Sequence, residues 1–187
     1  AFWTVGGALG AGITASGIDF TSLQGDKAVV EIMQRMGADI AQNADSVTVN
    51  SGATQATVID ASNCPDIIPV LTVLAAVSEG TTKIINAGRL RIKECDRLAA
   101  ITSELNKMGA NIDVHTPSAF INGKTKLHGS KVTATDLRCG AGLVIAALMA
   151  DGVTEIHDIY HIDRGYDNLD GKLAHLGAKM WREEVEE

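Results

Sequence analysis

The sequence predicts an α/β fold: a single domain of three βαβαββ repeats around a pseudo-threefold axis. One recurring phrase is an amphipathic helix that ends at a glycine, seen in "VEIMQRMGADI", "TSELNKMGANI" and "DGKLAHLGAKM". A second is an apolar helix that ends at a glycine, seen in "WTVGGALGAG", "PVLTVLAAVSEG" and "VIAALMADG". Both phrases recur with a period of about 70 residues, and two independent landmarks with one period indicate a threefold internal repeat.

Each repeat contains the same elements in the same order. The apolar helix is followed by a short strand ("ITASGI", "TKIINA", "TEIHDIY"), a polar loop, the amphipathic helix and further strand. This order predicts repeat units at approximately 1–55, 56–127 and 128–187 within one domain, 1–187. The first strand of the first unit is missing, because the sequence begins inside the first apolar helix.

The number of repeats favours a ring over an open stack. Three repeats stacked as a solenoid would expose large apolar ends, since the sequence has no capping repeat. Around a pseudo-threefold axis, the first helices, rich in glycine and alanine, bury against one another. We therefore expect the amphipathic helices outside, covering sheet, and the repeated polar loops at one common end.

Composition bounds the class of protein. The chain of 187 residues has 45% apolar and 21% charged residues, which is typical of a soluble globular domain. Its formal charge of −7 argues against nucleic acid as a partner. The longest apolar stretch, "CGAGLVIAALMA", is shorter than the roughly 20 residues that span a membrane. The three cysteines form no CxxC pair and, with no signal-like start, predict reduced thiols and a cytoplasmic location.

Charged residues are dense in the polar loops of the second and third units. Arg97 and Arg164 follow the second strands, and Lys93 precedes Arg97. On residue types alone this is equally a solvated charged loop in which Asp96 caps the next helix. If the loops share one end, however, four cations converge, and fork-shaped arginines match carboxylate and phosphate. The cluster then predicts an anionic ligand that carries both groups, bound by Lys93, Arg97, Arg138 and Arg164.

The starts of the apolar helices carry acids at equivalent places. Asp66 in "NCPDIIPV" corresponds to Asp136 in "ATDLRCGAG". An aspartate at a helix start is ordinarily a cap, which is the alternative for both residues. Arg138 in a first turn opposes the helix dipole, so its position indicates an anionic partner. Within such a cationic surround, Asp66, Glu94 and Asp136 are candidates for proton transfer.

Two long motifs resemble known families. "LQGDKAVVEIMQRMGADI" and "LRIKECDRL", within residues 1 to about 115, resemble 5-enolpyruvylshikimate-3-phosphate synthase. "HGSKVTATDLRCGAGLVIAALMADG" and "HIDRGYD" resemble UDP-N-acetylglucosamine enolpyruvyl transferase. Both families belong to the enolpyruvyl transferase superfamily, whose active site lies between two domains of three βαβαββ units each. The resemblance implies one such domain, and the mixture predicts a chimera joined near residues 113 to 127.

The resemblance also implies a reaction and roles for individual residues. The enolpyruvyl group of phosphoenolpyruvate would move to a hydroxyl of shikimate 3-phosphate, releasing phosphate, with no cofactor or metal. The implied catalytic residues are Asp66, Glu94 and Asp136. The implied substrate-binding residues are Lys93, Arg97, Arg138 and Arg164. Leu137 stands where the shikimate family has a histidine, so UDP-N-acetylglucosamine stays open as the acceptor.

Other interpretations remain at this stage. Because the second domain is absent, we expect negligible turnover by the chain alone. A structural module without activity is therefore one alternative. A metal-binding module is another, since each of Cys64, Cys95 and Cys139 lies within two residues of a predicted site residue, although zinc normally requires a fourth ligand.

Overall fold

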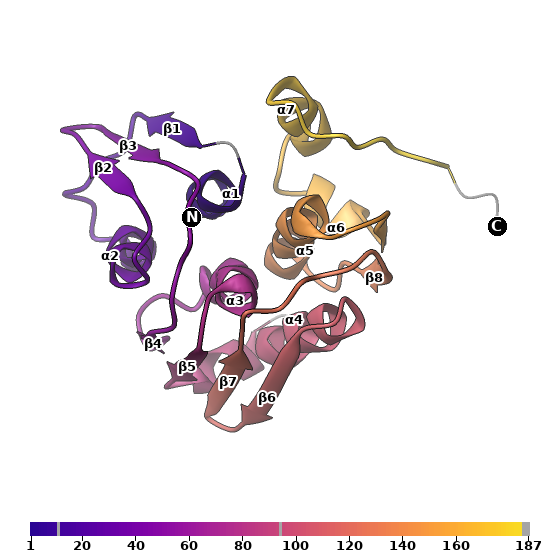
Figure 1. Cartoon of the computed structure of the whole chain (residues 1–187), viewed down its shortest axis with the longest axis horizontal. Coiled ribbons are helices and arrows are strands. Elements are labelled where there is room, and N and C mark those ends of the chain that lie inside the picture. The colour runs from indigo at the N-terminus through magenta and orange to yellow at the C-terminus, as the bar shows by residue number, and fades with distance from the viewer. Residues whose placement is uncertain (11, 94, 185–187) are drawn as a thin grey trace.

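The computed structural model describes residues 1–10, 12–93 and 95–184 (Figure 1). Its elements form three groups, which occupy residues 2–49, 58–122 and 131–175. The first group consists of α1 (Phe2–Leu9), β1 (Ile13–Ser16), η1 (Gly25–Lys27), α2 (Ala28–Arg35), β2 (Ile40–Gln42) and β3 (Ser46–Val49). The second consists of β4 (Val58–Asp60), α3 (Ile68–Val77), β5 (Thr81–Ile85), η2 (Ala87–Ile92), α4 (Arg97–Lys107), β6 (Asn111–His115) and β7 (Ser118–Asn122). The third consists of β8 (Lys131–Thr133), α5 (Leu137–Met149), β9 (Glu155–His157), α6 (Tyr160–Asp163) and α7 (Leu169–His175).

The three groups follow the predicted βαβαββ order to different extents. The second group shows it in full, with sheet order β4-β5-β7-β6 and a parallel β4–β5 pair. The first group forms an antiparallel sheet of order β1-β3-β2. The third group contains the parallel pair β8–β9 and the extra short helix α6, and no strand follows α7 up to residue 184. The expectation of further strand after α7 is wrong for this described segment, which is shorter than the hairpin β6–β7.

The apolar helices form the centre of the molecule. Helices α1, α3 and α5 contact one another pairwise, and Figure 1 shows them facing the middle while the sheets lie outside. Nine consecutive residues of α3, 68–76, are buried. Gly140 lets α5 pack closely, because a Cβ there would lie 2.7 Å from Ile162 Cγ1 and 2.9 Å from Ala134 Cβ. The prediction that the apolar helices bury against one another is therefore confirmed.

The ends of the amphipathic helices also follow the sequence prediction. Gly37, Gly109 and Gly177 each lie two residues after the last residue of α2, α4 and α7, directly after the C-cap residue, with φ of 79°, 92° and 97°. This left-handed conformation favours glycine over residues with a side chain. None of the helices in the described part of the chain has the length and apolarity needed to cross a bilayer.

Candidate functional site

Two arginines from different element groups meet one aspartate. Asp66 lies in the turn before α3, Arg97 is the first residue of α4, and Arg138 lies in the first turn of α5. Arg97 Nη1 donates to Asp66 Oδ1 at 2.6 Å, and Arg138 Nη2 donates to Asp66 Oδ2 at 2.5 Å. We call these three residues the arginine–aspartate cluster. It joins the second and third groups at the starts of their helices.

The cluster is buried on one side and reaches solvent on the other. The Arg97 side chain is 1% exposed, whereas those of Asp66 and Arg138 are 28% and 31% exposed. Arg97 and Arg138 both donate to the Asp66 carboxylate, and their fork-shaped guanidinium groups also match the carboxylate and phosphate groups of a ligand. The anion predicted beside Arg138 is, in this structure, the carboxylate of Asp66.

The ionisation of Asp66 depends on the two arginines. Its burial favours the neutral acid, but the hydrogen bond from Arg97 and the charge of Arg138 together hold the pKa of Asp66 below its usual value. Asp66 is therefore a carboxylate at neutral pH. A carboxylate so stabilised is a weak base, which means that proton acceptance by Asp66 requires the arginines to take another anion.

The first turn of α4 is fixed by the residue before the cluster. Asp96 is the N-cap and accepts the backbone N–H of Ala99 at 3.1 Å. Its other carboxylate oxygen accepts from Arg91 Nε at 2.8 Å. The predicted capping role is confirmed. The cap fixes the start of the helix at Arg97, and so directs Arg97 toward Asp66.

Asp136 fixes the start of α5 in the same way. Its Oδ1 accepts the backbone N–H groups of Arg138 and Cys139 at 2.7 and 3.0 Å. Its Oδ2 accepts from the Cys95 thiol at 3.0 Å. Burial opposes ionisation, but the bonds from Cys139 and Cys95 hold the pKa of Asp136 below its usual value. Oδ1 therefore holds the backbone of Arg138 in place, and Oδ2 ties Asp136 to Cys95.

The cysteines near the cluster are thiols that donate hydrogen bonds. Burial, followed by the Asp136 carboxylate, raises the pKa of Cys95 to about 12. Burial also raises the pKa of Cys139 far above its usual value. Cys64 lies elsewhere and donates to the carbonyl of Asp60. No group of three or more histidine, cysteine or acidic side chains suited to a metal occurs among the described residues, so the metal-module hypothesis is not supported.

Sequence reasoning missed Asp26. Asp26 lies in η1, where burial and then the charge of Asp66 raise its pKa, while Arg138 opposes the shift. Gly25 allows this approach, because a Cβ there would fall 1.9 Å from the carbonyl oxygen of Asn63, just before α3. The position of Asp26 could have been inferred from the loop "DFTSLQGD", because it is the first of the three polar loops that the repeat places at one end. Asp26 thus brings a second acid to the cluster.

Tyr166 was also missed. It lies after α6, is half-buried, and its ring centroid is 5.6 Å from that of Phe2. Burial raises the pKa of Tyr166, and the charge of Arg138 acts against that shift while Asp26 adds to it. The charges of Arg138 and Asp26 thus both act on the Tyr166 phenol. Tyr166 belongs to the motif "DRGY", of which the sequence analysis predicts a role for Arg164 alone.

Two of the four predicted cations, Lys93 and Arg164, lie outside the arginine–aspartate cluster. Lys93 follows η2 and Arg164 follows α6, and both are exposed. Within the described ranges, no hydrogen bond or ion pair joins either side chain to the cluster. Glu94 lies outside the described residues. The structure thus brings together Arg97 and Arg138 of the four predicted cations, while substrate contacts of Lys93, Glu94 and Arg164 stay predictions.

Comparison with known proteins gives a consistent family assignment. The family model of EPSP synthase (3-phosphoshikimate 1-carboxyvinyltransferase) matches residues 1–173. The 3-phosphoshikimate 1-carboxyvinyltransferase of Clostridium kluyveri is 55% identical over 134 residues, which are 72% of this chain and 32% of the relative. That of Clostridium perfringens (strain 13) is 49% identical over 186 residues, which are 98% of this chain and 44% of the relative.

Solved structures agree with this assignment. The EPSP synthase of Acinetobacter baumannii superposes with a TM-score of 0.83 at 25% identity, over 95% of this chain and 44% of that chain. The enolpyruvyl transferase NikO from Streptomyces tendae gives 0.77 at 27% identity, over 95% of this chain and 42% of that one. The chain therefore spans less than half the length of these relatives. The family match runs through most of the third group, and the separate resemblance of that group to the UDP-sugar family stays a prediction. On the match over residues 1–173, the chain belongs to the EPSP synthase family.

Proposed function

We propose that this chain supplies one side of the active site of an enolpyruvyl transferase. The enzyme moves the enolpyruvyl group of phosphoenolpyruvate to a hydroxyl of shikimate 3-phosphate and releases phosphate. The observation that carries the proposal is the meeting of Arg97 and Arg138 on Asp66, from the starts of two helices. Family membership supplies the substrate class.

The cluster suits the donor substrate in charge and shape. Phosphoenolpyruvate carries a carboxylate and a phosphate, and each is a planar or tripodal acceptor for paired N–H groups of arginine. In the proposed complex the two guanidinium groups donate to the donor substrate in place of the Asp66 carboxylate. Lys93 and Arg164 add positive charge at the exposed side.

Release of Asp66 from the arginines gives it a role in the chemistry. The reaction joins the acceptor's hydroxyl oxygen to the enolpyruvyl carbon and breaks the bond from that carbon to the phosphate oxygen, so the hydroxyl proton must leave. Once its pKa is no longer depressed by two bound arginines, Asp66 is a stronger base. Glu94 is the second proposed proton-transfer group. Asp136 acts through Arg138, since its two oxygens bond to the backbone and to Cys95.

One side of a cleft does not complete the reaction. Positioning two reactants together and excluding water supply much of the rate of such transfers. We therefore expect negligible turnover by the chain alone. Activity requires the polypeptide that corresponds to the part of the relatives beyond the match.

Complementation tests this proposal directly. The chain is mixed with the part of the Clostridium perfringens enzyme that lies outside the aligned 186 residues, and phosphate release is followed with phosphoenolpyruvate and shikimate 3-phosphate. We expect release only when both polypeptides are present. The matched variant is Arg97→Lys, which keeps the charge and loses the fork, and should lower the rate by about tenfold or more. The aligned part of the Clostridium perfringens enzyme is the positive control.

The same assay decides the acceptor. The second candidate, UDP-N-acetylglucosamine, follows from Leu137, which stands where the shikimate family has a histidine, and from the motifs of the third group. Release with UDP-N-acetylglucosamine and not with shikimate 3-phosphate would support the chimera and reject the main proposal. No release with either acceptor, while the positive control is active, would favour the structural module.

A further inference from the structure

Two thiol hydrogen bonds cross the junction between the second and third groups. Cys95, two residues before Arg97, donates from Sγ to Asp136 Oδ2 at 3.0 Å. Cys139, directly after Arg138, donates from Sγ to the Arg97 carbonyl oxygen at 3.5 Å. One donor lies before α4 and the other in the first turn of α5. The two bonds, which we call the thiol link, therefore join the same two helix starts in opposite directions.

The thiol link holds the backbone of both arginines of the cluster. Asp136 accepts the Cys95 thiol on Oδ2, while its Oδ1 accepts the backbone N–H of Arg138 at 2.7 Å. The second bond meets the backbone carbonyl of Arg97 directly. The separation of the two guanidinium groups therefore depends on the thiol link, in addition to the Asp66 carboxylate to which both donate.

Both thiols keep their protons at neutral pH. Cys139 is buried and Cys95 is half-buried. Burial, and after it the Asp136 carboxylate, raises the pKa of Cys95 to about 12 and also raises that of Cys139. A thiol donates only in its protonated form, and a charged acceptor strengthens the bond. The bond from Cys95 to Asp136 is therefore a charge-assisted contact that stays in place throughout the neutral range.

The thiol link does not depend on the bond between Asp66 and the arginines. In the proposed complex, the guanidinium groups of Arg97 and Arg138 turn from Asp66 to the donor substrate. The bonds of the thiol link meet backbone atoms and Asp136, none of which takes part in that exchange. After Asp66 is released, the thiol link therefore still fixes the two helix starts relative to each other.

We propose that Cys95 is a positioning residue for the donor substrate. Through Asp136 it sets the backbone of Arg138 relative to Arg97, and thereby the spacing of the two guanidinium groups. Phosphoenolpyruvate carries a carboxylate and a phosphate on one small molecule, so its affinity depends on that spacing, whereas a single anionic group needs only one arginine. The inference rests on the proposed function, because it takes phosphoenolpyruvate as the ligand of the cluster.

Two parallel titrations test this role. Phosphoenolpyruvate, and separately inorganic phosphate, is added at low salt to the isotope-labelled chain and to its Cys95→Ala variant, and amide shifts are followed by NMR. We expect the Kd of phosphoenolpyruvate to rise about fivefold in the variant, because one charge-assisted hydrogen bond behind Arg138 is lost. The Kd of inorganic phosphate should change by less than about twofold, since one anionic group needs no fixed spacing.

Two matched variants separate positioning from general stability. Cys95→Ser keeps a donor for Asp136 and should return the Kd of phosphoenolpyruvate to within about twofold of the wild type. Ser130→Ala removes another hydrogen bond between α4 and a segment next to β8, the one from Ser130 Oγ to the Lys107 carbonyl at 2.8 Å. That bond lies at the end of α4 remote from Arg97, so this variant should bind phosphoenolpyruvate like the wild type.

The free chain gives a readout that needs no ligand. The backbone N–H of Arg138 donates to Asp136, so its hydrogen exchange should be several-fold faster in Cys95→Ala. Burial raises the pKa of Asp136, whereas the bonds from Cys139 and Cys95 lower it. The pKa of Asp136, measured from its carboxyl carbon shift, should therefore be higher in Cys95→Ala than in Cys95→Ser. Both the exchange rate and this pKa should be unchanged in Ser130→Ala.

Other results would overturn the inference. A wild type that binds phosphoenolpyruvate with the same Kd as Cys95→Ala would contradict the inference and leave the proposed function standing. An equal rise in Kd for both ligands, a matching rise in Ser130→Ala, or a Cys95→Ala chain without a dispersed spectrum would assign to the thiol link the stability of the fold instead. A wild type that binds no phosphoenolpyruvate would contradict the proposed function and this inference together.

Discussion

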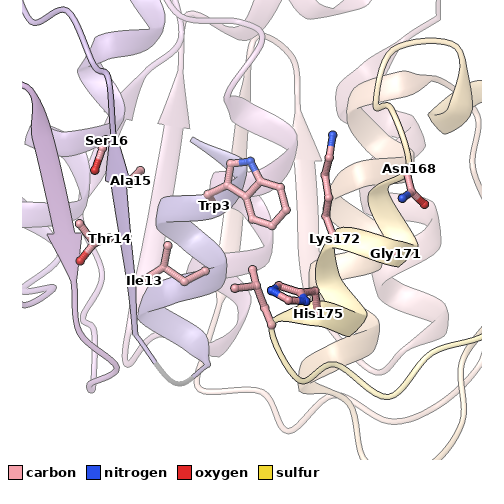
Figure 2. Close-up of a pocket in the computed structure, with 10 residues that line it drawn as sticks. Trp3, Ile13, Thr14, Ala15, Ser16, Asn168, Gly171, Lys172 and His175 are labelled. Carbon is pink, nitrogen blue, oxygen red and sulfur yellow. The ribbon is translucent and has the colours of Figure 1, made fainter.

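The junction between the second and third groups differs from the junction between the third and first. At the former, β8 fills the space beside α4, and the arginine–aspartate cluster lies at the helix starts with Arg97 1% exposed. At the latter lies a groove of about 550 Å³ between β1 and α7, lined by Trp3, Ile13 and Leu176 among others (Figure 2). The same arrangement of elements therefore supports a closed polar junction and an open apolar one.

This difference between the two junctions predicts how much each contributes to the stability of the fold. At the closed junction the Arg97 guanidinium is out of water and pairs with Asp66, so removal of either partner leaves the other without its counter-charge from this pair. Side chains of the open junction already contact solvent, so their removal costs little. Mutations at the two junctions should separate by several-fold in their effect on the free energy of unfolding.

The largest effect is expected from Arg97→Ala. It removes a buried guanidinium and leaves Asp66 with Arg138, which should lower the free energy of unfolding by about 3–5 kcal/mol. Urea unfolding at pH 7 measures it. The control is Arg91→Ala, whose exposed pair with Asp96 should contribute no more than about 1 kcal/mol. Equal losses in the two variants would remove the distinction between buried and exposed charge.

Asp66→Asn is expected to lower the free energy of unfolding by a smaller amount, and this loss should depend on pH. At pH 7 the loss should be about 1–3 kcal/mol, because two arginines lose their shared acceptor. The pKa of Asp66 is lower in the folded state than in the unfolded state, so its contribution is present above the unfolded value and disappears as pH falls through the folded one. The stability of the wild type should therefore approach that of the variant in acid. Parallel pH profiles would contradict this.

Asp26→Asn is expected to raise the free energy of unfolding, where the two preceding variants lower it. The folded-state pKa of Asp26 is raised, first by burial and then by Asp66, so its ionised form weakens the fold at pH values above that pKa. The variant should be slightly more stable than the wild type at pH 7, by less than about 1 kcal/mol. The gain should vanish below the unfolded pKa. Thermal unfolding at the two pH values measures this difference, and a loss at pH 7 would show that the Asp26 carboxylate is itself a needed partner.

The smallest change in the free energy of unfolding is expected in the groove between β1 and α7. Leu176→Ala should change the free energy of unfolding by less than about 0.5 kcal/mol, since Leu176 is 59% exposed. Leu173→Ala is the matched change on the same helix, and should cost about 2–5 kcal/mol because Leu173 is 5% exposed. Comparable losses in the two variants would mean that Leu176 is buried in solution and that the groove is closed there.

Much of the fold follows from periodic features of the sequence. The glycines that end helices and the apolar runs gave the element order and the central helices, because both features are local. The absence of strand after α7 was not predictable, since a strand depends on a partner elsewhere. For the same reason the apolar groove at β1 carries no local signal in "ITAS".

The site was predictable in part. Arg138 opposes its helix dipole, and this local conflict correctly indicated an anionic partner. The partner itself, Asp66, lies 72 positions away along the chain, and no local rule joins the two. Asp26 was missed because it lies in a short loop with few charges, and its place beside Asp66 depends on the contact of Gly25 with Asn63.

The account's central claim is that Arg97 and Arg138 form an anion site, which the Asp66 carboxylate occupies in this structure. Titration of phosphoenolpyruvate into the isotope-labelled chain at low salt, with amide shifts followed by NMR, tests it most directly. The account predicts saturable shifts at residues 66, 97 and 136–138 that weaken as salt is added and are lost in Arg138→Gln. A well-dispersed spectrum without response, or an equal response in Arg138→Gln, would contradict the claim.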